Sequence, residues 1–363
     1  MNESTPESNG ARPERSEKNP ATTDITELAP GVLRSQLPVE LPGLGHVNCY
    51  MLQDSDGVAV VDPGLPGDDA WAALVDRLKR ADYSVGDVHT VIVTHSHYDH
   101  YGGAERLREE AGARIVGHHS LHNRMAPPDI DDDAEFIDVN GEVKRGRGET
   151  GFGRITPWGT WSEPPVEVVS HWKKLGIGLG NAFPQAPTPD VAMRDAEQIT
   201  LTGRPWVAVH TPGHTADHLC LYDAEEGLML TGDHVLPTIT PHISGFADDE
   251  APLARFMDSL KRMHDFSDVK LAMPAHGNPF TDLTGRADHI CGHHLERLDE
   301  FRDAASELES APVEAFMKHA FKERSWGDMA TSETYAHLDH LRDHGELDAT
   351  WVDGLLHFGT TSS

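Results

Sequence analysis

The sequence predicts an α/β fold in which buried strands lead into polar loops that carry functional side chains. Short apolar runs, such as residues 88–93, alternate with amphipathic segments, such as residues 69–80. This alternation of strand and helix is typical of an α/β sheet. Histidines and aspartates directly follow several of the apolar runs. We therefore expect the functional site at the ends of strands.

Composition narrows the class of protein. The chain has 363 residues and 38% hydrophobic content, which suits one large domain with an appendage. Its formal net charge of −30 repels nucleic acid and anionic membranes, so neither is an expected partner. Cys49, Cys220 and Cys291 are too few and too scattered for a disulfide framework. No segment reaches the roughly 18 apolar residues of a membrane helix, and we expect a cytoplasmic protein.

The N-terminal third begins with a polar segment and continues with strands. Residues 1–25 are rich in Glu, Ser, Asn, Pro and Arg and are predicted to form a disordered tail. Strands are predicted over residues 31–37, 47–53 and 57–61, the last after a turn at 54–56. A helix over residues 69–80 carries Trp71, Leu74, Val75 and Leu78 on one apolar face.

The chain is organised around residues 94–103, which read Thr-His-Ser-His-Tyr-Asp-His-Tyr-Gly-Gly. This loop lies between the strand at 88–93 and a helix predicted at 104–110. His95 and His97 alternate, so two rings can point at one metal ion, while Asp99 and His100 face a second position. Because the chain holds 24 histidines, such a motif can arise by coincidence, and its context has to decide.

Other candidate ligands follow later strands in the same way. His214 lies in the loop after a strand at 206–210, Asp233 follows a hairpin at 219–230, and His276 follows a strand at 269–273. An amphipathic helix is predicted over residues 252–263. Asp62 closes the strand at 57–61, just before Pro-Gly.

Residues 121–204 interrupt this alternation and are predicted to form an insertion. The segment contains Pro127-Pro128, an acidic run at 129–133 and many glycines. Long loops in compact domains are usually functional or disordered. The insertion could be a lid over the site that carries the aromatic side chains of Trp158, Trp161, His171 and Trp172. These side chains could equally form a small core of their own.

The ordered motifs resemble the metallo-β-lactamase superfamily over residues 26–284. The resemblance implies an αββα sandwich with two metal ions. One ion would be held by His95, His97 and His214, and the other by Asp99, His100 and His276, with Asp233 bridging both. Asp62 would support the ligands from behind, because a carboxylate that accepts a hydrogen bond from a ligating imidazole fixes its orientation. Zinc is the expected divalent ion, with iron and manganese as alternatives.

Residues 285–363 are predicted to form a helical appendage. Ser332 to Leu341 and Gly345 to Leu347 resemble a small winged-helix appendage of a β-lactamase-like subgroup. Winged helices often bind DNA, but these residues include seven Lys and Arg against sixteen Asp and Glu, a net charge of about −9. We expect the appendage to pack on the catalytic domain, to shape the edge of the pocket or to form a homodimer.

The predicted function is hydrolysis of a small-molecule ester, thioester or lactone by a metal-bound hydroxide. Asp99 is the predicted catalytic residue, which would hold and orient that hydroxide. The bridging aspartate resembles glyoxalase II, lactonases and related nucleases more than enzymes that hydrolyse antibiotics. A metal-dependent ribonuclease, a mononuclear iron dioxygenase acting on a thiol-derived substrate and a non-catalytic scaffold remain alternatives. The sequence identifies no substrate-binding residue.

Several other side chains near the motifs have open roles. Tyr98 and Tyr101 could donate to an oxyanion, although packing is the expected role. Four histidines close in sequence to ligands could support them from behind: His210, His218, His234 and His242. His118 and His119 follow a strand end, where a polar loop is the expected environment.

Overall fold

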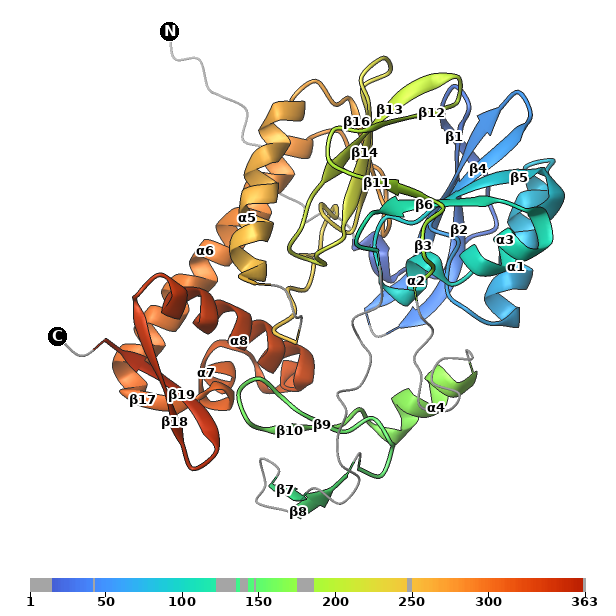
Figure 1. Ribbon diagram of the computed structural model, residues 1–363. Coiled ribbons are helices and arrows are strands. Elements are labelled where there is room, and N and C mark those ends of the chain that lie inside the picture. Colours follow the sequence, from blue (N-terminus) through green and yellow to red (C-terminus); the bar gives the residue numbers. More distant parts are fainter. Residues whose placement is uncertain are drawn as a thin grey trace, which may run out of the picture.

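The computed structural model describes residues 15–41, 43–121, 135–137, 143–146, 148–174, 186–246 and 250–361. Two sheets face each other, and helices cover the outer side of each (Figure 1). This arrangement confirms the predicted αββα sandwich. Within the described residues, no helix has the length and apolar character that crossing a membrane requires.

The first sheet has seven strands in the order β1-β2-β3-β4-β5-β6-β11. They are β1 (Thr26–Ala29), β2 (Val32–Leu41), β3 (Leu44–Asp54), β4 (Gly57–Val61), β5 (Val88–Ile92), β6 (Arg114–His118) and β11 (Val191–Met193). β4 and β5 are parallel, with Val61 opposite Ile92. The residues that follow these two strands therefore emerge at the same edge of the sheet, which brings Asp62 beside the histidine loop.

The second sheet has five strands in the order β12-β13-β14-β15-β16. They are β12 (Gln198–Leu201), β13 (Arg204–His210), β14 (Leu219–Asp223), β15 (Leu228–Gly232) and β16 (Leu271–Pro274). Buried side chains of both sheets, including Tyr50, Ile92, Trp206 and Leu230, form one core between them. Burying apolar surface from both faces holds the sheets together.

Helices α1 (Asp68–Arg80) and α3 (Ala104–Ala111) cover the first sheet. In α1 the predicted stripe is only partly correct, because Val75 is 37% exposed while Leu74 and Leu78 are fully buried. Arg77 is buried instead, and its Nε donates to the carbonyl of Gln36. Between β5 and α3 along the chain lies the one-turn helix α2 (Tyr98–Tyr101), which carries part of the histidine loop.

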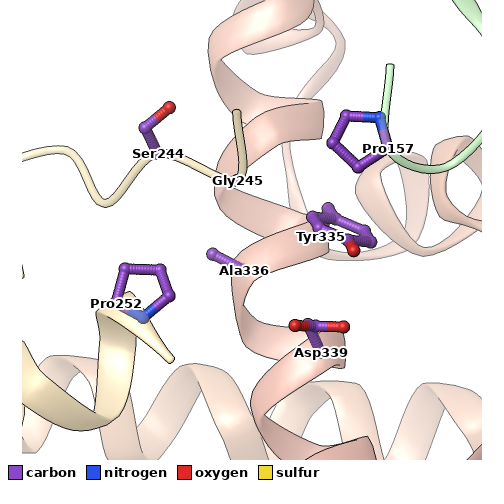
Figure 2. Close-up of a pocket in the computed structure, with 7 residues that line it drawn as sticks. All are labelled: Pro157, Ser244, Gly245, Pro252, Tyr335, Ala336 and Asp339. Carbon is purple, nitrogen blue, oxygen red and sulfur yellow. The ribbon is translucent and has the colours of Figure 1, made fainter. Parts of the chain in front are cut away.

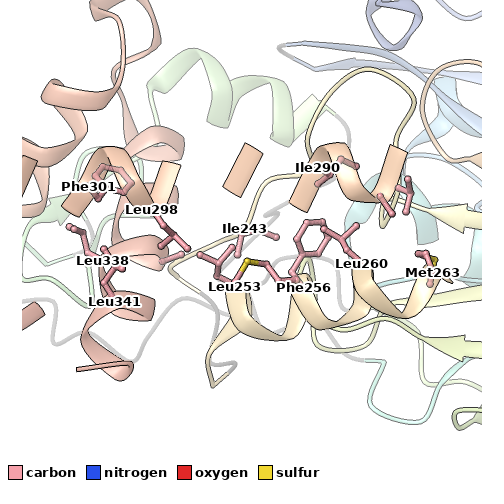
Figure 3. Close-up of a cluster of buried hydrophobic side chains, with 14 of the residues drawn as sticks. Ile243, Leu253, Phe256, Leu260, Met263, Ile290, Leu298, Phe301, Leu338 and Leu341 are labelled. Carbon is pink, nitrogen blue, oxygen red and sulfur yellow. The ribbon is translucent and has the colours of Figure 1, made fainter. Parts of the chain in front are cut away.

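The outer face of the second sheet packs on α5 (Pro252–Arg262) and on the start of α6 (Leu283–Leu308). The helix predicted at residues 252–263 is confirmed, with Leu253, Phe256 and Leu260 buried on its inner face. Figure 3 shows that the same cluster continues into the C-terminal helices through Leu298, Leu338 and other apolar side chains. One continuous core therefore joins the appendage to the two-sheet sandwich.

The appendage combines three helices with a small sheet in the order β17-β19-β18. Its elements are α6, β17 (Ser310–Pro312), α7 (Val313–Ala320), η4 (Glu323–Ser325), α8 (Asp328–Asp343), β18 (Leu347–Val352) and β19 (Leu355–Thr360). Helix α8 ends at Asp343, and Leu347 begins β18. Gly345, with a φ of +72°, makes the turn between them at low steric cost.

The described parts of the insertion are β7 (Glu135–Ile137), β8 (Val143–Arg145), β9 (Arg154–Ile155), β10 (Trp161–Ser162) and α4 (Val166–Lys174). Pro127-Pro128, the acidic run at 129–133 and the side chain of His171 lie outside the described residues. Trp158, which was a candidate lid residue, is buried in the core shared with the appendage, and its Nε1 donates to Glu314 at 3.1 Å. The stretch from β11 to β12, although inside the predicted insertion, pairs into both sheets.

The N-terminal prediction needs a correction for residues 15–25, which belong to the folded unit. Ser16–Lys18 forms the 3-10 helix η1, and the side chain of Glu17 is fully buried. Its carboxylate accepts hydrogen bonds from the backbone N–H and hydroxyl of Thr238. The polar composition of this segment is typical of a disordered tail, and its folding depends on partners that lie more than two hundred residues away in the sequence.

Two further 3-10 helices are η2 (Val85–Asp87) and η3 (Met263–Phe266).

Candidate metal centre

Three histidines and an aspartate form the first group of candidate ligands. Nδ1 of His97 lies 3.0 Å from Nε2 of His95 and 3.0 Å from Nε2 of His214. Oδ2 of Asp233 lies 3.5 Å from Nε2 of His214. These side chains come from the loops after β5, β13 and β15, so strand ends of both sheets meet here.

A second group lies directly beside the first and contains Asp99, His100 and His276. Nε2 of His276 is 3.4 Å from Oδ2 of Asp99 and 3.4 Å from Oδ1 of Asp233. Nε2 of His100 is 3.7 Å from Oδ2 of Asp233. Asp233 therefore touches both groups, which is the placement that a bridging carboxylate requires. All seven residues that we predicted as ligands converge in these two groups.

Hydrogen bonds behind the rings orient their free nitrogens toward the centre. Nδ1 of His100 donates to Oδ2 of Asp62 at 2.9 Å, and Nδ1 of His95 donates to the hydroxyl of Thr94 at 3.0 Å. That hydroxyl donates in turn to Oδ2 of Asp62 at 2.8 Å. Each Nε2 is left with a lone pair that faces the site, as metal ligation requires.

Backbone carbonyls orient the other two Nδ1 donors. Nδ1 of His214 donates to the carbonyl of His242 at 2.8 Å, and Nδ1 of His276 donates to the carbonyl of His46 at 2.7 Å. The ring of His46 is itself held, because its Nδ1 donates to the carbonyl of Asn19 at 2.7 Å. The N-terminal segment thus reaches the metal centre through one intermediate residue.

Two backbone conformations allow this arrangement. Asp62 has a φ of +52°, which is uncommon for a residue other than glycine but is tolerated by aspartate. Gly213, just before His214, has a φ of +135°, and a Cβ there would lie 2.4 Å from Cα of Phe256. Only glycine lets the His214 loop pack directly against α5.

The electrostatics of the group set ionised carboxylates against buried imidazoles. Burial and neighbouring imidazoles lower the pKa of His97 to about 3. Burial alone raises the pKa of Asp99, but His100 and His276 outweigh it and bring that pKa well below its usual range. The pKa of Asp233 is lowered in the same way. The same carboxylates raise the pKa of His100 and of His276 against the effect of burial.

The donor set fits divalent cations. Nε2 of His100, Nε2 of His276 and Oδ1 of Asp233 are buried and have no hydrogen-bond partner. Burying such polar atoms without a partner is costly, and a cation would satisfy them together. Imidazole and carboxylate suit zinc, iron and manganese alike. His95, His97, His214 and Asp233 would hold one ion, while Asp99, His100 and His276 would hold the second beside it.

The structure also shows the contacts of several open candidates. His218 supports Asp233, whose backbone N–H donates to Nε2 of His218 at 3.0 Å. His210 and His118 stack on each other, with ring centroids 4.1 Å apart. Tyr98 hydrogen bonds to Trp172 of α4, so the insertion does reach the histidine loop. The supporting carbonyls of His46 and His242 could not be predicted from the sequence, because every residue has a carbonyl and it leaves no sequence signal.

Comparison with known proteins agrees with this geometry. Residues 42–276 match the family described as "Metallo-beta-lactamase superfamily". The chain is 23% identical over 329 residues to the probable metallo-hydrolase YqjP of Bacillus subtilis, covering 87% of this chain and 94% of that protein. It is also 26% identical over 195 residues to a hydroxyacylglutathione hydrolase of Ectopseudomonas mendocina, covering 53% of this chain and 49% of the relative.

A solved structure shares the fold over nearly the whole chain. A β-lactamase domain protein from Burkholderia ambifaria superposes with a TM-score of 0.73 at 24% identity. The match covers 96% of this chain and 97% of that one. The similarity includes the appendage as well as the sandwich.

Proposed function

This chain belongs to the metallo-β-lactamase superfamily, and on that premise we propose that it is a binuclear metal-dependent hydrolase of small esters, thioesters or lactones. The observation that carries the proposal is the placement of Asp233. Its Oδ2 lies 3.5 Å from Nε2 of His214 and its Oδ1 lies 3.4 Å from Nε2 of His276. One carboxylate in contact with both groups supports two ions rather than one, and this favours hydrolysis over single-iron oxygen chemistry.

The chemistry of such a site is general. When bound, two divalent ions lower the pKa of water from about 15.7 toward 7 and polarise the scissile carbonyl. The protein supplies the geometry. Asp62, Thr94 and the carbonyls of His46 and His242 hold the ligand rings in place before substrate arrives. Little reorganisation is then needed during the reaction.

Asp99 is the proposed catalytic residue. Its pKa lies well below the usual range, because His100 and His276 outweigh burial, so the carboxylate is ionised at neutral pH. An ionised Oδ2 can accept a hydrogen bond from the attacking water and orient it toward the substrate carbonyl. It is too weak a base to take the proton fully, so its role is to position the water.

The substrate class rests on the relatives and on charge. The name of the Ectopseudomonas mendocina relative describes hydrolysis of an acylated glutathione, which supports the thioester class. The net charge of −30 opposes binding of a polyanionic RNA. We further propose zinc as the metal, a cytoplasmic location, a winged-helix-like appendage and no nucleic-acid partner.

The test combines metal content with a substrate panel. Elemental analysis of the purified protein is expected to find two divalent ions per chain. Turnover is expected on at least one member of a panel of thioesters, esters and lactones, and none on a short RNA. One iron per chain without hydrolysis would overturn the proposal in favour of oxygen chemistry. RNA cleavage would show that a local basic surface outweighs the overall charge.

A further inference from the structure

The segment of residues 238–246 runs between the metal centre and the C-terminal appendage. It has no helix or strand of its own in the structure. At His242 its carbonyl accepts the hydrogen bond from Nδ1 of His214 at 2.8 Å. The orientation of this candidate ligand therefore depends on where the segment lies.

Helix α8 of the appendage contacts the segment at two points. Nδ1 of His242 lies 3.7 Å from Oε2 of Glu333, with the two side chains 22% and 20% exposed. Three residues on, the backbone N–H of Gly245 donates to the hydroxyl of Ser332 at 2.9 Å. A Cβ on Gly245 would lie 2.6 Å from the carbonyl oxygen of Ser332. The backbone thus packs directly on α8, and Figure 2 shows Gly245 beside Tyr335.

The N-terminal end of the segment is held independently. Nη2 of Arg286, on the first turn of α6, donates to the carbonyl of Ile239 at 2.7 Å. The carboxylate of Glu17 accepts from the N–H groups of Thr238 and Ile239. With this end fixed, the contacts to α8, together with the burial of Ile243 in the shared core, set the position of residues 242–245.

The surroundings of Glu333 keep it charged. Burial raises its pKa, but His242, His337 and His294 outweigh burial and lower that pKa to about 2. His293 also faces it from α6. The negative charge of Glu333 favours the rotamer of His242 that turns an N–H group of the imidazole toward this carboxylate.

We propose that Glu333 is a positioning residue for the metal centre: together with Ser332 it fixes residues 242–245, and through the carbonyl of His242 it fixes the ring of His214. The inference rests on the proposed function in taking His214 as a metal ligand. It gives the appendage a defined role, since a helix more than one hundred residues downstream of His214 completes the support of one ion site. The ion held by Asp99, His100 and His276 lacks this dependence.

The test is a double-mutant cycle on Glu333→Ala and His242→Ala. His242→Ala removes the imidazole but keeps the carbonyl that His214 uses. Metal affinity is measured by competition between the protein and a chelator for Zn²⁺ and for Co²⁺. In each single variant the affinity for one of the two ions is expected to fall about 10 to 100-fold, and the affinity for the other is expected to stay unchanged. A fall of this size is typical when a contact that supports a ligand is lost. The double variant is expected to be no weaker than either single one, because both act through one contact.

A matched control lies on the same helix. Asp343→Asn removes a charge near the end of α8 that pairs with Arg342 inside the appendage, and it is expected to leave both affinities unchanged. Thermal unfolding checks that each variant is folded, and Glu333→Gln replaces Glu333→Ala if the latter does not fold. Hydrogen exchange of the metal-free protein provides a second readout. The peptide that covers residues 238–246 should exchange faster in the Glu333 variant and not in the control.

Two results would overturn the inference. Affinities and loop exchange equal to those of the wild type would show that Glu333 positions nothing. Losses that simply add in the double variant would show that Glu333 and His242 do not act through each other. Failure of the proposed function gives a different result. The wild type would then bind two ions and hydrolyse no substrate, while the metal affinities of the variants would still differ from those of the wild type.

Discussion

Nδ1 of His100 lies 2.9 Å from Oδ2 of Asp62, a contact between residues 38 positions apart in the sequence. The same carboxylate accepts hydrogen bonds from the N–H and the hydroxyl of Thr94. One buried side chain therefore orients His100 directly and His95 through Thr94. These two rings belong to different ligand groups, so Asp62 couples the geometry of both.

Replacing Asp62 by asparagine should weaken metal binding. Asp62→Asn places an N–H group where His100 and Thr94 now find an acceptor, or leaves one of them without a partner. Loss of such support typically costs 10 to 100-fold in metal affinity. Chelator competition measures the change. The exposed carboxylate of Asp87 offers a control, and Asp87→Asn should behave as wild type; an equal loss in both variants would show a nonspecific charge effect.

Asp233→Asn should lower metal content and turnover together. The amide cannot serve as an anionic ligand to two ions, so both groups lose a contact. Elemental analysis and kcat are measured on the same preparation. Tyr98→Phe is the comparison, because the Tyr98 ring lies next to the ligands without being one, and its metal content should stay at the wild-type value. An Asp233→Asn protein with two ions and full activity would refute the bridging role.

Glu17→Ala should destabilise the fold although it lies far from the main core in sequence. The carboxylate is fully buried and accepts from Thr238 and Ile239. Leaving these partly buried donors without a protein acceptor costs about 1 kcal/mol, at the low end of the range for buried groups. Urea unfolding measures the loss, and Lys18→Ala, at an exposed neighbouring position, should change little. If both variants unfolded with the same free energy, the contacts of Glu17 would not contribute to the stability of the fold.

Two buried histidines in the appendage should make stability depend on pH. Burial, together with the neighbouring His337, lowers the pKa of His294 to about 3, and burial lowers the pKa of His337 to about 4. Nδ1 of His337 donates to the carbonyl of Glu333 at 2.7 Å, so its Nε2 accepts from Nδ1 of His294 at 3.1 Å. Both rings are therefore neutral in the folded protein.

Below about pH 6.5 the unfolded chain protonates these rings and the folded protein does not. The unfolded state then binds more protons, so stability falls as pH decreases from about 6.5 toward 4, by up to about 1.4 kcal/mol per pH unit for each ring. Urea unfolding at pH 7 and pH 5 measures the slope. His337→Gln should flatten it, and an unchanged slope would place the acid sensitivity elsewhere.

The strand-and-loop pattern singled out the candidate side chains, and the resemblance to the family assigned them as ligands. His95, His97, Asp99 and His100 stand together after a buried strand, so their proximity is local. His214, Asp233 and His276 each follow a strand of the same sandwich, and the order of these motifs is what resembles the family. The short apolar strands and helix α5 could also be predicted from the sequence, because the periodicity of their apolar side chains reflects burial on one face.

Other features could not be read in this way. Val75 fits the helical stripe of α1 yet is 37% exposed. Trp158, in the predicted insertion, packs on the appendage and donates to Glu314, 156 residues away. Nothing in the local sequence around a tryptophan indicates which distant element will cover it.

The sequence by itself indicated the α/β fold, because hydrophobic periodicity is a local property, and its ordered motifs indicated the seven candidate ligands and Asp62 through their resemblance to the family. Tertiary structure alone decided which other groups hold those ligands in place. The carbonyls of His46 and His242, the carboxylate of Glu17 and the contact from Glu333 all act across long sequence separations. Backbone carbonyls are chemically identical along the chain, and only folding selects the ones that meet a histidine.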